Sequence, residues 1–434
     1  MLPKTRTLFS LLIAICLGLP LQRAGAAQDA PRIELAALSA GAEQEVKGNI
    51  LPFWLKYTRD ADDGGYYGFI GADMTVKKGA SRGSLLTSRV LWTFSTAYRT
   101  YHDPAYLEMA TYAYHDLVEH FWDKEDGGIF WTITGDGKPE AVNKLIYGEV
   151  FGIYGLAEYY RATGDRAALD SAISIYNLVE KNAHDPKYGG YYDLLDRKWG
   201  RMGPMPHSPM GDAAKSQNSH IHIMEAYTEL LRVWPDAGLR ANLRALVDMT
   251  IQHIIDPRTH HLILFMKEDW TPVSDGVSYG HDIELSWLLD EAAGVLGDPA
   301  LIARTRAISL DIARATLAEG IDPDGGVINE GGPHGYTDTD KDWWPQAEAA
   351  IGFLNAYQLS GEPRFLEASR HSWEFIQARF VDRKYGDWIE KVKRDGTPVA
   401  RPKVTLWKCP YHSSRSCFEL MERVRELTEE RVSP

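Results

Sequence analysis

The chain has 434 residues, of which 44% are hydrophobic and 25% are charged, and it carries a formal net charge of −13 at pH 7. This is the composition of a globular protein with ample apolar material for a core. The acidic balance argues against nucleic acid or an anionic membrane surface as a partner, and beyond the N-terminus no segment is apolar enough to cross a membrane.

The N-terminus has the pattern of a targeting segment. Lys4 and Arg6 give a positive start, an apolar run extends from Leu8 to Leu21, and Ala24-Gly25-Ala26 is a small-residue cleavage site. This arrangement is typical of a secretory signal peptide. We therefore expect residues 1–26 to be removed and the mature protein to be exported, either to the periplasm or out of the cell, with no membrane attachment.

A glycine-containing turn followed by large apolar or aromatic residues recurs along the chain. Its copies stand at Gly64-Gly65, Gly127-Gly128, Gly189-Gly190, Gly325-Gly326 and Gly386-Asp387. Counted from the first glycine, the gaps are 63, 62, 136 and 61 residues. The longest gap is close to two periods, and Asp256-Pro257 followed by His261 to Phe265 lies midway as a degenerate copy. The sequence thus predicts six repeated units, each with a tight turn and a short hairpin-like strand.

Each turn is expected to separate two helices. The helix before the turn is amphipathic, with predicted ranges 35–54, 105–121, 166–182, 239–255, 300–317 and 363–380. The helix after it is more apolar and aromatic, with predicted ranges 89–101, 147–162, 218–233, 281–296, 344–359 and 417–427. Six such pairs favour an all-α fold, an (α/α)6 barrel of six helical hairpins. The more apolar helix of each pair would lie inside, and short β-hairpins would lie in the loops. It would form a single domain over residues 27–434, and an open solenoid of helical pairs is the alternative.

Unusual polar or aromatic residues stand at the start of the inner helices. They are Arg89, Tyr147, Asn218 with His222, His281 with Glu284, Trp344 with Glu348, and His412. Trp287 follows His281 and Glu284 at intervals of three, so it shares their helical face. His220, two residues before His222, should face elsewhere and is expected to be structural. In a closed ring, equivalent positions of the inner helices lie at one end, so the other side chains should converge on one site.

These residue types suit proton transfer on a sugar. Aromatic rings cover the C–H faces of sugars, while carboxylates and amides bind their hydroxyls. Histidines move protons near neutral pH. An arginine can stabilise the enediolate that forms when a carbon next to a carbonyl is deprotonated. No cofactor is needed for this chemistry.

Other interpretations fit parts of the same pattern. His281 could be a core histidine paired with Glu284. Two His-x-x-Glu pairs, beginning at His222 and His281, could ligate a divalent metal, although their order is the reverse of the di-iron motif. The carboxylates of Glu149, Glu284 and Glu348 could serve an inverting glycoside hydrolase. A sugar-binding protein without chemistry is a further alternative. The number of histidines favours metal-free proton transfer over all of these.

Six stretches carry a resemblance to a known family. They cover residues 89–95, 146–148, 215–222, 278–284, 342–348 and 407–412, which read RVLWTFS, IYG, KSQNSHIH, SYGHDIE, DWWPQAE and WKCPYH. The chain resembles the N-acylglucosamine 2-epimerase superfamily, and most closely the cellobiose 2-epimerases, over essentially all of its mature length. The resemblance implies an (α/α)6 barrel. It also implies reversible C2 epimerisation of the reducing-end glucose or mannose unit of a β-1,4-linked disaccharide such as cellobiose, lactose or mannobiose.

The resemblance implies a role for each site residue. His281 and His412 would be the acid/base pair at C2, His222 would assist ring opening, and Arg89 would hold the C1 and C2 oxygens. The residues expected to bind the sugar are Tyr147, Asn218, Glu284, Trp287, Trp344, Glu348 and Trp407. No metal or cofactor is implied, and we expect a monomer or weak homodimer. Aldose–ketose isomerisation through the same enediolate is the alternative activity.

Overall fold

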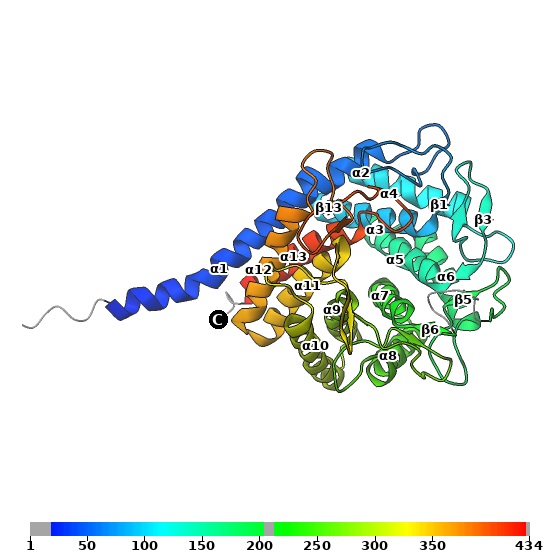
Figure 1. The fold of residues 1–434 in the computed structure, drawn as a ribbon. Helices are drawn as coiled ribbons and strands as arrows, with labels where there is room; N and C mark the ends of the chain where they lie inside the picture. Colours follow the sequence, from blue (N-terminus) through cyan, green and yellow to red (C-terminus); the bar gives the residue numbers. More distant parts are fainter. Residues whose placement is uncertain (1–18, 204–211, 431–434) are drawn as a thin grey trace, which may run out of the picture.

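Six helices form a closed inner ring (Figure 1). The computed structural model describes residues 19–203 and 212–430. The inner helices are α3 (Ser84–Tyr101), α5 (Ile146–Thr163), α7 (Gln217–Val233), α9 (Tyr279–Leu296), α11 (Trp343–Ser360) and α13 (Tyr411–Glu430). Each packs against the next, and α13 packs against α3. The predicted (α/α)6 barrel is therefore confirmed, and the open solenoid is excluded.

An outer helix accompanies each inner one. The outer helices are α1 (Leu19–Glu45) continued by η1 (Val46–Ile50) and α2 (Leu51–Tyr57), α4 (Pro104–Asp116) continued by η2 (Leu117–Phe121), α6 (Arg166–Asn182), α8 (Ala237–Met249) continued by η3 (Thr250–Ile254), α10 (Pro299–Glu319) and α12 (Pro363–Arg379). The inner helices are buried almost all round, and α3 has no exposed residue from Ser84 to Ala97. The outer helices bury one stripe, as their amphipathic sequences predict.

Three inner helices pass to their outer neighbours through the same short turn. α5, α9 and α11 end at Gly164, Gly297 and Gly361, whose φ angles are 75°, 73° and 68°. These angles lie in the left-handed region, where a residue with a Cβ is strained. In two of the turns the next residue is an aspartate, Asp165 or Asp298, whose carboxylate accepts N–H groups of the following helix. The glycine stops one helix and the aspartate starts the next.

Each outer helix is followed by a turn that an antiparallel bridge closes. The six bridges are Arg59–Tyr66, Trp122–Ile129, His184–Tyr191, Ile255–Leu262, Ile321–Val327 and Val381–Trp388. The fourth bridge belongs to the unit whose turn contains no glycine. There His260 adopts a φ of 63°, whereas Gly127 has a φ of 75° at the equivalent place. The degenerate copy predicted at Asp256-Pro257 is therefore confirmed as the fourth of the six units.

Short antiparallel strands join the loops of neighbouring units. A strand precedes each of five inner helices: β1 (Arg82–Gly83), β4 (Lys144–Leu145), β6 (Lys215–Ser216), β8 (Val277–Ser278) and β11 (Lys341–Asp342). Each pairs with a strand of the next loop: β2 (Thr132–Ile133), β5 (Leu194–Leu195), β7 (Phe265–Met266), β9 (Glu330–Gly332) and β12 (Lys391–Val392). Three sheets gain a hairpin partner, from β3 (Pro139–Ala141), β10 (Gly335–Asp338) and β13 (Pro398–Val399). The predicted loop hairpins are present there, and the other pairs cross between units.

The last inner helix differs most from its predicted start. It begins at Tyr411, not at residue 417. Residues 411–416 are mostly polar, so their own apolarity does not predict a helix. They are nevertheless buried in the ring, with exposed fractions between 0% and 5%. Tertiary packing therefore decides their conformation.

The N-terminal helix covers the expected cleavage site. α1 begins at Leu19 and continues through residues 24–26, and Figure 1 shows its first turns reaching away from the barrel. Residues 1–18 lie outside the described part of the chain, so the signal peptide stays a prediction. Among the described residues, no helix combines the length and apolar composition needed to span a membrane.

The fourth residue of four inner helices has one shared structural task. It accepts the backbone N–H of the residue that follows the preceding turn. The four pairs are Glu149 with Ile129, His220 with Tyr191, Asp282 with Leu262 and Gln346 with Val327. The structural role expected for His220 is confirmed. Glu149, a candidate for hydrolase chemistry, is a turn-holding residue in the same way.

Replacing Glu149 with glutamine is expected to stabilise the fold at alkaline pH. Burial raises the pKa of Glu149 to about 8 from an ordinary value of 4.5. The folded state therefore keeps a proton that the unfolded state has lost, and stability falls as pH rises from about 4.5 to 8. Glutamine has no proton to lose, and Gln346 already performs this task in α11. Glu149→Gln should gain on the order of 2 kcal/mol at pH 8 and little at pH 5.

Thermal unfolding at pH 5 and pH 8 measures this difference. The reverse exchange, Gln346→Glu, is the matched control and should introduce a loss of stability with rising pH. A Glu149→Gln variant that is less stable than the parent at both pH values would contradict the interpretation.

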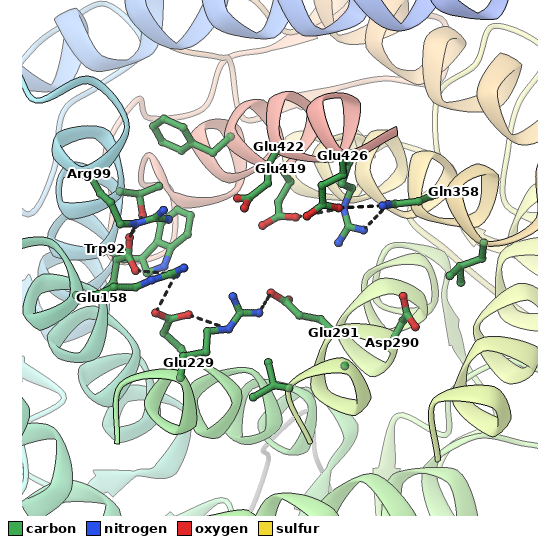
Figure 2. Close-up of a pocket in the computed structure, with 18 of the residues that line it drawn as sticks. Trp92, Arg99, Glu158, Glu229, Asp290, Glu291, Gln358, Glu419, Glu422 and Glu426 are labelled. Atoms are coloured by element: carbon green, nitrogen blue, oxygen red, sulfur yellow. Dashed lines mark hydrogen bonds and ion pairs between the residues drawn. The ribbon is translucent and has the colours of Figure 1, made fainter. Parts of the chain in front are cut away.

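A pocket of about 670 Å³ lies at the end of the barrel where the inner helices finish (Figure 2). Its charged side chains pair with one another. Arg99 contacts Glu158 at 2.9 Å, and Arg232 contacts both Glu229 and Glu291. None of the predicted site residues lines this pocket. The site must therefore be built at the other end of the ring.

Candidate active site

The predicted site residues meet where the inner helices begin. Ten of the eleven are linked to one another through direct contacts, either between themselves or through Arg415: Arg89, Tyr147, His222, His281, Glu284, Trp287, Trp344, Glu348, Trp407 and His412. The eleventh, Asn218, lies in the first turn of α7, one turn before His222. Residues scattered from position 89 to position 412 are thus gathered because the ring brings equivalent helix starts together.

Arg89 supplies a fixed positive charge to this group. Its exposed fraction is 2%, and its Nη2 donates to the Tyr147 hydroxyl at 2.7 Å. The guanidinium lies over the rings of Phe151 at 4.2 Å and Tyr411 at 4.8 Å. The Nε–H has no hydrogen-bond partner. A buried guanidinium held by aromatic faces, with donors to spare, suits an oxygen that gains negative charge.

Two histidines are oriented by carboxylates. His222 Nδ1 lies 2.7 Å from Glu225 Oε2, and His412 Nδ1 lies 2.8 Å from Glu348 Oε1. An ionised carboxylate only accepts, so each Nδ1 must carry the hydrogen. The Nε2 atom of each imidazole is then left with a lone pair, which is the form that takes up a proton.

His281 and His412 are brought together by Trp344. The ring centroid of Trp344 lies 4.6 Å from that of His281 and 5.8 Å from that of His412. His281 Nδ1 also lies 2.8 Å from the hydroxyl of Ser278. A Cβ on Gly280 would meet the Trp344 ring at 2.6 Å, so a glycine is required for this tryptophan to reach the histidines. The imidazoles of His281 and His412 therefore both contact the indole ring of Trp344.

Burial keeps the three imidazoles neutral at physiological pH. It lowers the pKa of His281 to about 3 and lowers the pKa of both His222 and His412 below their ordinary value. The positive charges of Arg89 and Arg415 act in the same direction on His412. Neutral imidazoles are proton acceptors, so each can act as a base when a substrate arrives.

Two further residues offer unused contacts at the site. The side-chain oxygen of Asn218 is buried without a hydrogen-bond partner. Trp407 is 48% exposed, and its ring lies 5.7 Å from both Tyr147 and Trp131. An orphan amide oxygen and an exposed aromatic face are the features that a sugar hydroxyl and a sugar ring use.

Comparison with known proteins decides the family. The sequence profile described as N-acylglucosamine 2-epimerase (GlcNAc 2-epimerase) matches residues 65–415. The chain belongs to this family.

Its relatives resemble it over nearly their whole length. Proteins named cellobiose 2-epimerase from Bacteroides fragilis and Dictyoglomus turgidum are 41% and 36% identical over 382 and 394 residues. These alignments cover 87% and 90% of this chain and 97% and 100% of the relatives. The solved structure of cellobiose 2-epimerase from Bacillus thermoamylovorans B4167 matches with a TM-score of 0.86 at 36% identity, covering 89% of this chain and 100% of that one.

In this member of the N-acylglucosamine 2-epimerase family, three expected sugar-binding residues lie deep in the barrel. Trp287, Glu284 and Glu348 are at most 1% exposed. Trp287 donates its indole N–H to Glu348 at 3.1 Å, and the oxygens of Glu284 and Glu348 that face Arg415 are bonded to its guanidinium. Glu348 holds His412 directly, and Trp287 acts through Glu348, while Glu284 lies beside His222. Of the two carboxylates, only Glu284 keeps an oxygen without a hydrogen-bond partner, and this oxygen lies 4.0 Å from His222 Nε2.

The sequence interpretation missed Arg415, which lies at the centre of the carboxylates. It stands three residues after His412, so the two share a helical face. Because the sequence predicted the last inner helix from residue 417 only, this spacing carried no signal. Glu225, the glutamate of the His-x-x-Glu pair that begins at His222, was not among the predicted site residues, yet it contacts both Tyr411 and Arg415.

The arrangement around Arg415 also bears on the metal hypothesis. Glu284, Glu348 and His412 each offer one ligand atom within 4.8 Å of the others. The guanidinium of Arg415 already bonds both carboxylates, at 2.5 and 2.7 Å. The guanidinium of Arg415 therefore supplies the positive charge that these carboxylates need. A divalent ion in addition to Arg415 does not fit these residues.

Proposed function

We propose that this protein epimerises the reducing-end glucose or mannose unit of β-1,4-linked disaccharides at C2. The observation that supports this most directly is the placement of His281 and His412 against the single ring of Trp344, with Arg89 in the same cluster. The relatives at 41% and 36% identity are named cellobiose 2-epimerase. The placement of the histidines and the activity of the named relatives both favour proton transfer next to a carbonyl.

The first step would be binding and opening of the sugar ring. Trp407 and Trp344 offer partly exposed aromatic faces, and Asn218 offers its unpaired oxygen to a hydroxyl. Ring opening moves a proton from the C1 hydroxyl to the ring oxygen. His222 would carry this proton on Nε2, which lies 4.0 Å from Glu284, while Glu225 holds Nδ1. The open form exposes a C1 aldehyde, which acidifies the hydrogen on C2.

The second step would be removal and return of the C2 proton. One histidine takes the proton on Nε2 and becomes an imidazolium, and for His412 the bonded Glu348 stabilises that cation. The electron pair left on C2 moves onto the C1 oxygen, giving an enediolate beside Arg89. The C1–C2 unit then rotates about the C2–C3 single bond. The other histidine takes up a proton from solvent beside the negative enediolate and delivers it to the opposite face of C2, while the first histidine releases the C2 proton to solvent.

The inverting-hydrolase alternative fits this geometry poorly. Such enzymes hold their two carboxyl groups about 6.5–9.5 Å apart, so that a water fits between them. Here Glu284 and Glu348 are bonded to the same Nη2 atom of Arg415. Glu149, the third candidate, holds a turn.

NMR of cellobiose, lactose and mannobiose incubated with the enzyme in D2O tests the function. Interconversion of the glucose and mannose forms, with deuterium appearing at C2, is the expected result. A ketose product without the C2 epimer would point to aldose–ketose isomerisation through the same enediolate. Release of monosaccharides, or no change in any of the three sugars, would contradict the proposal.

A further inference from the structure

Arg415 joins three carboxylates from three different helices. It is fully buried. Its Nη1 contacts Glu225 of α7, and its Nη2 contacts Glu284 of α9 at 2.5 Å and Glu348 of α11 at 2.7 Å. The faces of Trp287 and Tyr411 lie 4.9 and 4.3 Å from the guanidinium carbon. One planar fork therefore fixes groups on three sides at once, which a lysine could not do.

Two of these carboxylates hold histidines. Glu225 reaches Arg415 through Oε1 and His222 Nδ1 through Oε2. Glu348 accepts from both Arg415 and His412 Nδ1 through Oε1. Two relays of the form arginine–carboxylate–imidazole thus start from one guanidinium. Partners of this kind fix which nitrogen of an imidazole carries the hydrogen and how the ring is turned.

The charges in this cluster show what Arg415 contributes. Burial alone would raise the pKa of Glu225, yet the charge of Arg415, together with the contacts from His222 and Tyr411, holds that pKa at about 2. Burial and the charge of Glu348 raise the pKa of Glu284 to about 8, so Glu284 carries a proton at neutral pH. The charge of Arg415 thus favours the ionised form of Glu225, which faces His222. At Glu348, which faces His412, burial raises the pKa while the charge and hydrogen bond of Arg415 act to lower it. Without the guanidinium, buried carboxylates would take up protons.

We propose that Arg415 is a positioning residue that sets the tautomer of both His222 and His412 through Glu225 and Glu348. The proposal rests on the proposed epimerisation, because it concerns the same site. If the guanidinium is removed, a protonated Glu225 or Glu348 donates its O–H to Nδ1. The imidazole hydrogen then moves to Nε2, and the nitrogen that faces the substrate can no longer act as a base.

The tautomers are measured first, without substrate, by 15N-resolved NMR of the histidines in the full-length protein. Wild type should show Nδ1–H on both His222 and His412. Glu225→Gln should change His222 alone, and Glu348→Gln should change His412 alone, because an amide can donate to Nδ1. Arg415→Met should change both. If Arg415→Met leaves both tautomers unchanged, the proposal is overturned, whatever the activity proves to be.

Kinetics then separate positioning from a merely structural role. Arg415→Met should lower kcat by roughly 100-fold or more with a small change in KM, since a misplaced imidazole hydrogen disables the base. In the Glu348→Gln background the same change should cost less, because one of the two relays, that to His412, is already broken and only the relay to His222 is left to lose. Additive losses would contradict the proposal.

A matched control accounts for the cost of losing a buried arginine. Arg82 is 3% exposed and pairs with Asp116, away from the cluster. Arg82→Met should lower thermal stability but leave kcat and both histidine tautomers unchanged. Should Arg415→Met fail to fold, Arg415→Lys and the two glutamine variants keep the test open. Lysine retains the charge without the fork, so it should restore at most one of the two tautomers, and wild-type tautomers on both histidines would overturn the proposal.

Discussion

Alanine at His281 or at His412 is expected to abolish epimerisation while leaving the barrel folded. The two imidazoles flank one site beside Trp344, and burial keeps both of them neutral. If each serves one face of C2, removing either breaks the reaction in both directions. We expect a loss of at least 1,000-fold in kcat, at the upper end of what a single acid/base group contributes. Circular dichroism and thermal unfolding should match the parent.

The two variants should differ in a second measurement. In D2O, the remaining histidine can still remove and return the C2 proton on its own face. Each variant should therefore exchange deuterium into one epimer, glucose or mannose, without forming the other, and the two variants should prefer opposite epimers. His371→Ala, at an exposed position of α12, is the control and should retain full activity. Near-parental epimerisation by either site variant would show that the acid/base assignment is wrong.

Replacement of Arg89 is expected to have the next largest effect. Arg89→Met keeps much of the side-chain volume under Phe151 and Tyr411 but removes the charge and the donor to Tyr147. The loss of one preorganised donor at a developing oxyanion typically costs about 100- to 1,000-fold in kcat. Because the charge matters most in the enediolate, kcat should fall far more than KM rises.

Two further variants sharpen this experiment. Arg89→Lys keeps the charge and should recover part of the lost rate, while Tyr147→Phe removes the hydroxyl that Arg89 contacts and should have a smaller effect. Steady-state kinetics on cellobiose, with deuterium exchange at C2 as a second readout, measure all three. An Arg89→Met variant that raises KM but keeps kcat would show that Arg89 binds the sugar without stabilising the enediolate.

The repeat explains why so much of the fold was predictable. Each unit needs a sharp turn, and glycines mark five of the six turns in the sequence because they accept left-handed backbone at little cost. Even the unit without glycine is detectable, since its spacing is kept and His260 adopts the required conformation. In a closed ring of six units, residues as distant in sequence as Arg89 and His412 converge because their helices begin at the same end.

Depth along a helix was not predictable in the same way. Trp287 shares a face with His281, but it stands six residues further on, about 9 Å along the helix axis. It therefore lies deeper in the barrel than His281, where its indole N–H donates a hydrogen bond to Glu348. Arg415 was missed because residues 411–416 are too polar to predict a buried helix. A periodic pattern reports the face of a side chain, while its level in the barrel and its partners depend on packing between helices.

The common direction of the inner helices has an electrostatic consequence. An α-helix carries roughly half a positive charge at its start and half a negative charge at its end. Six such starts surround the histidines, so the backbone itself creates a potential that favours an enediolate and disfavours an imidazolium. At the far end six helix ends meet, and there Arg99, Arg161 and Arg232 occupy the last turns of α3, α5 and α7. The barrel is therefore polarised along its axis, and an anionic intermediate is favoured at only one of its two ends.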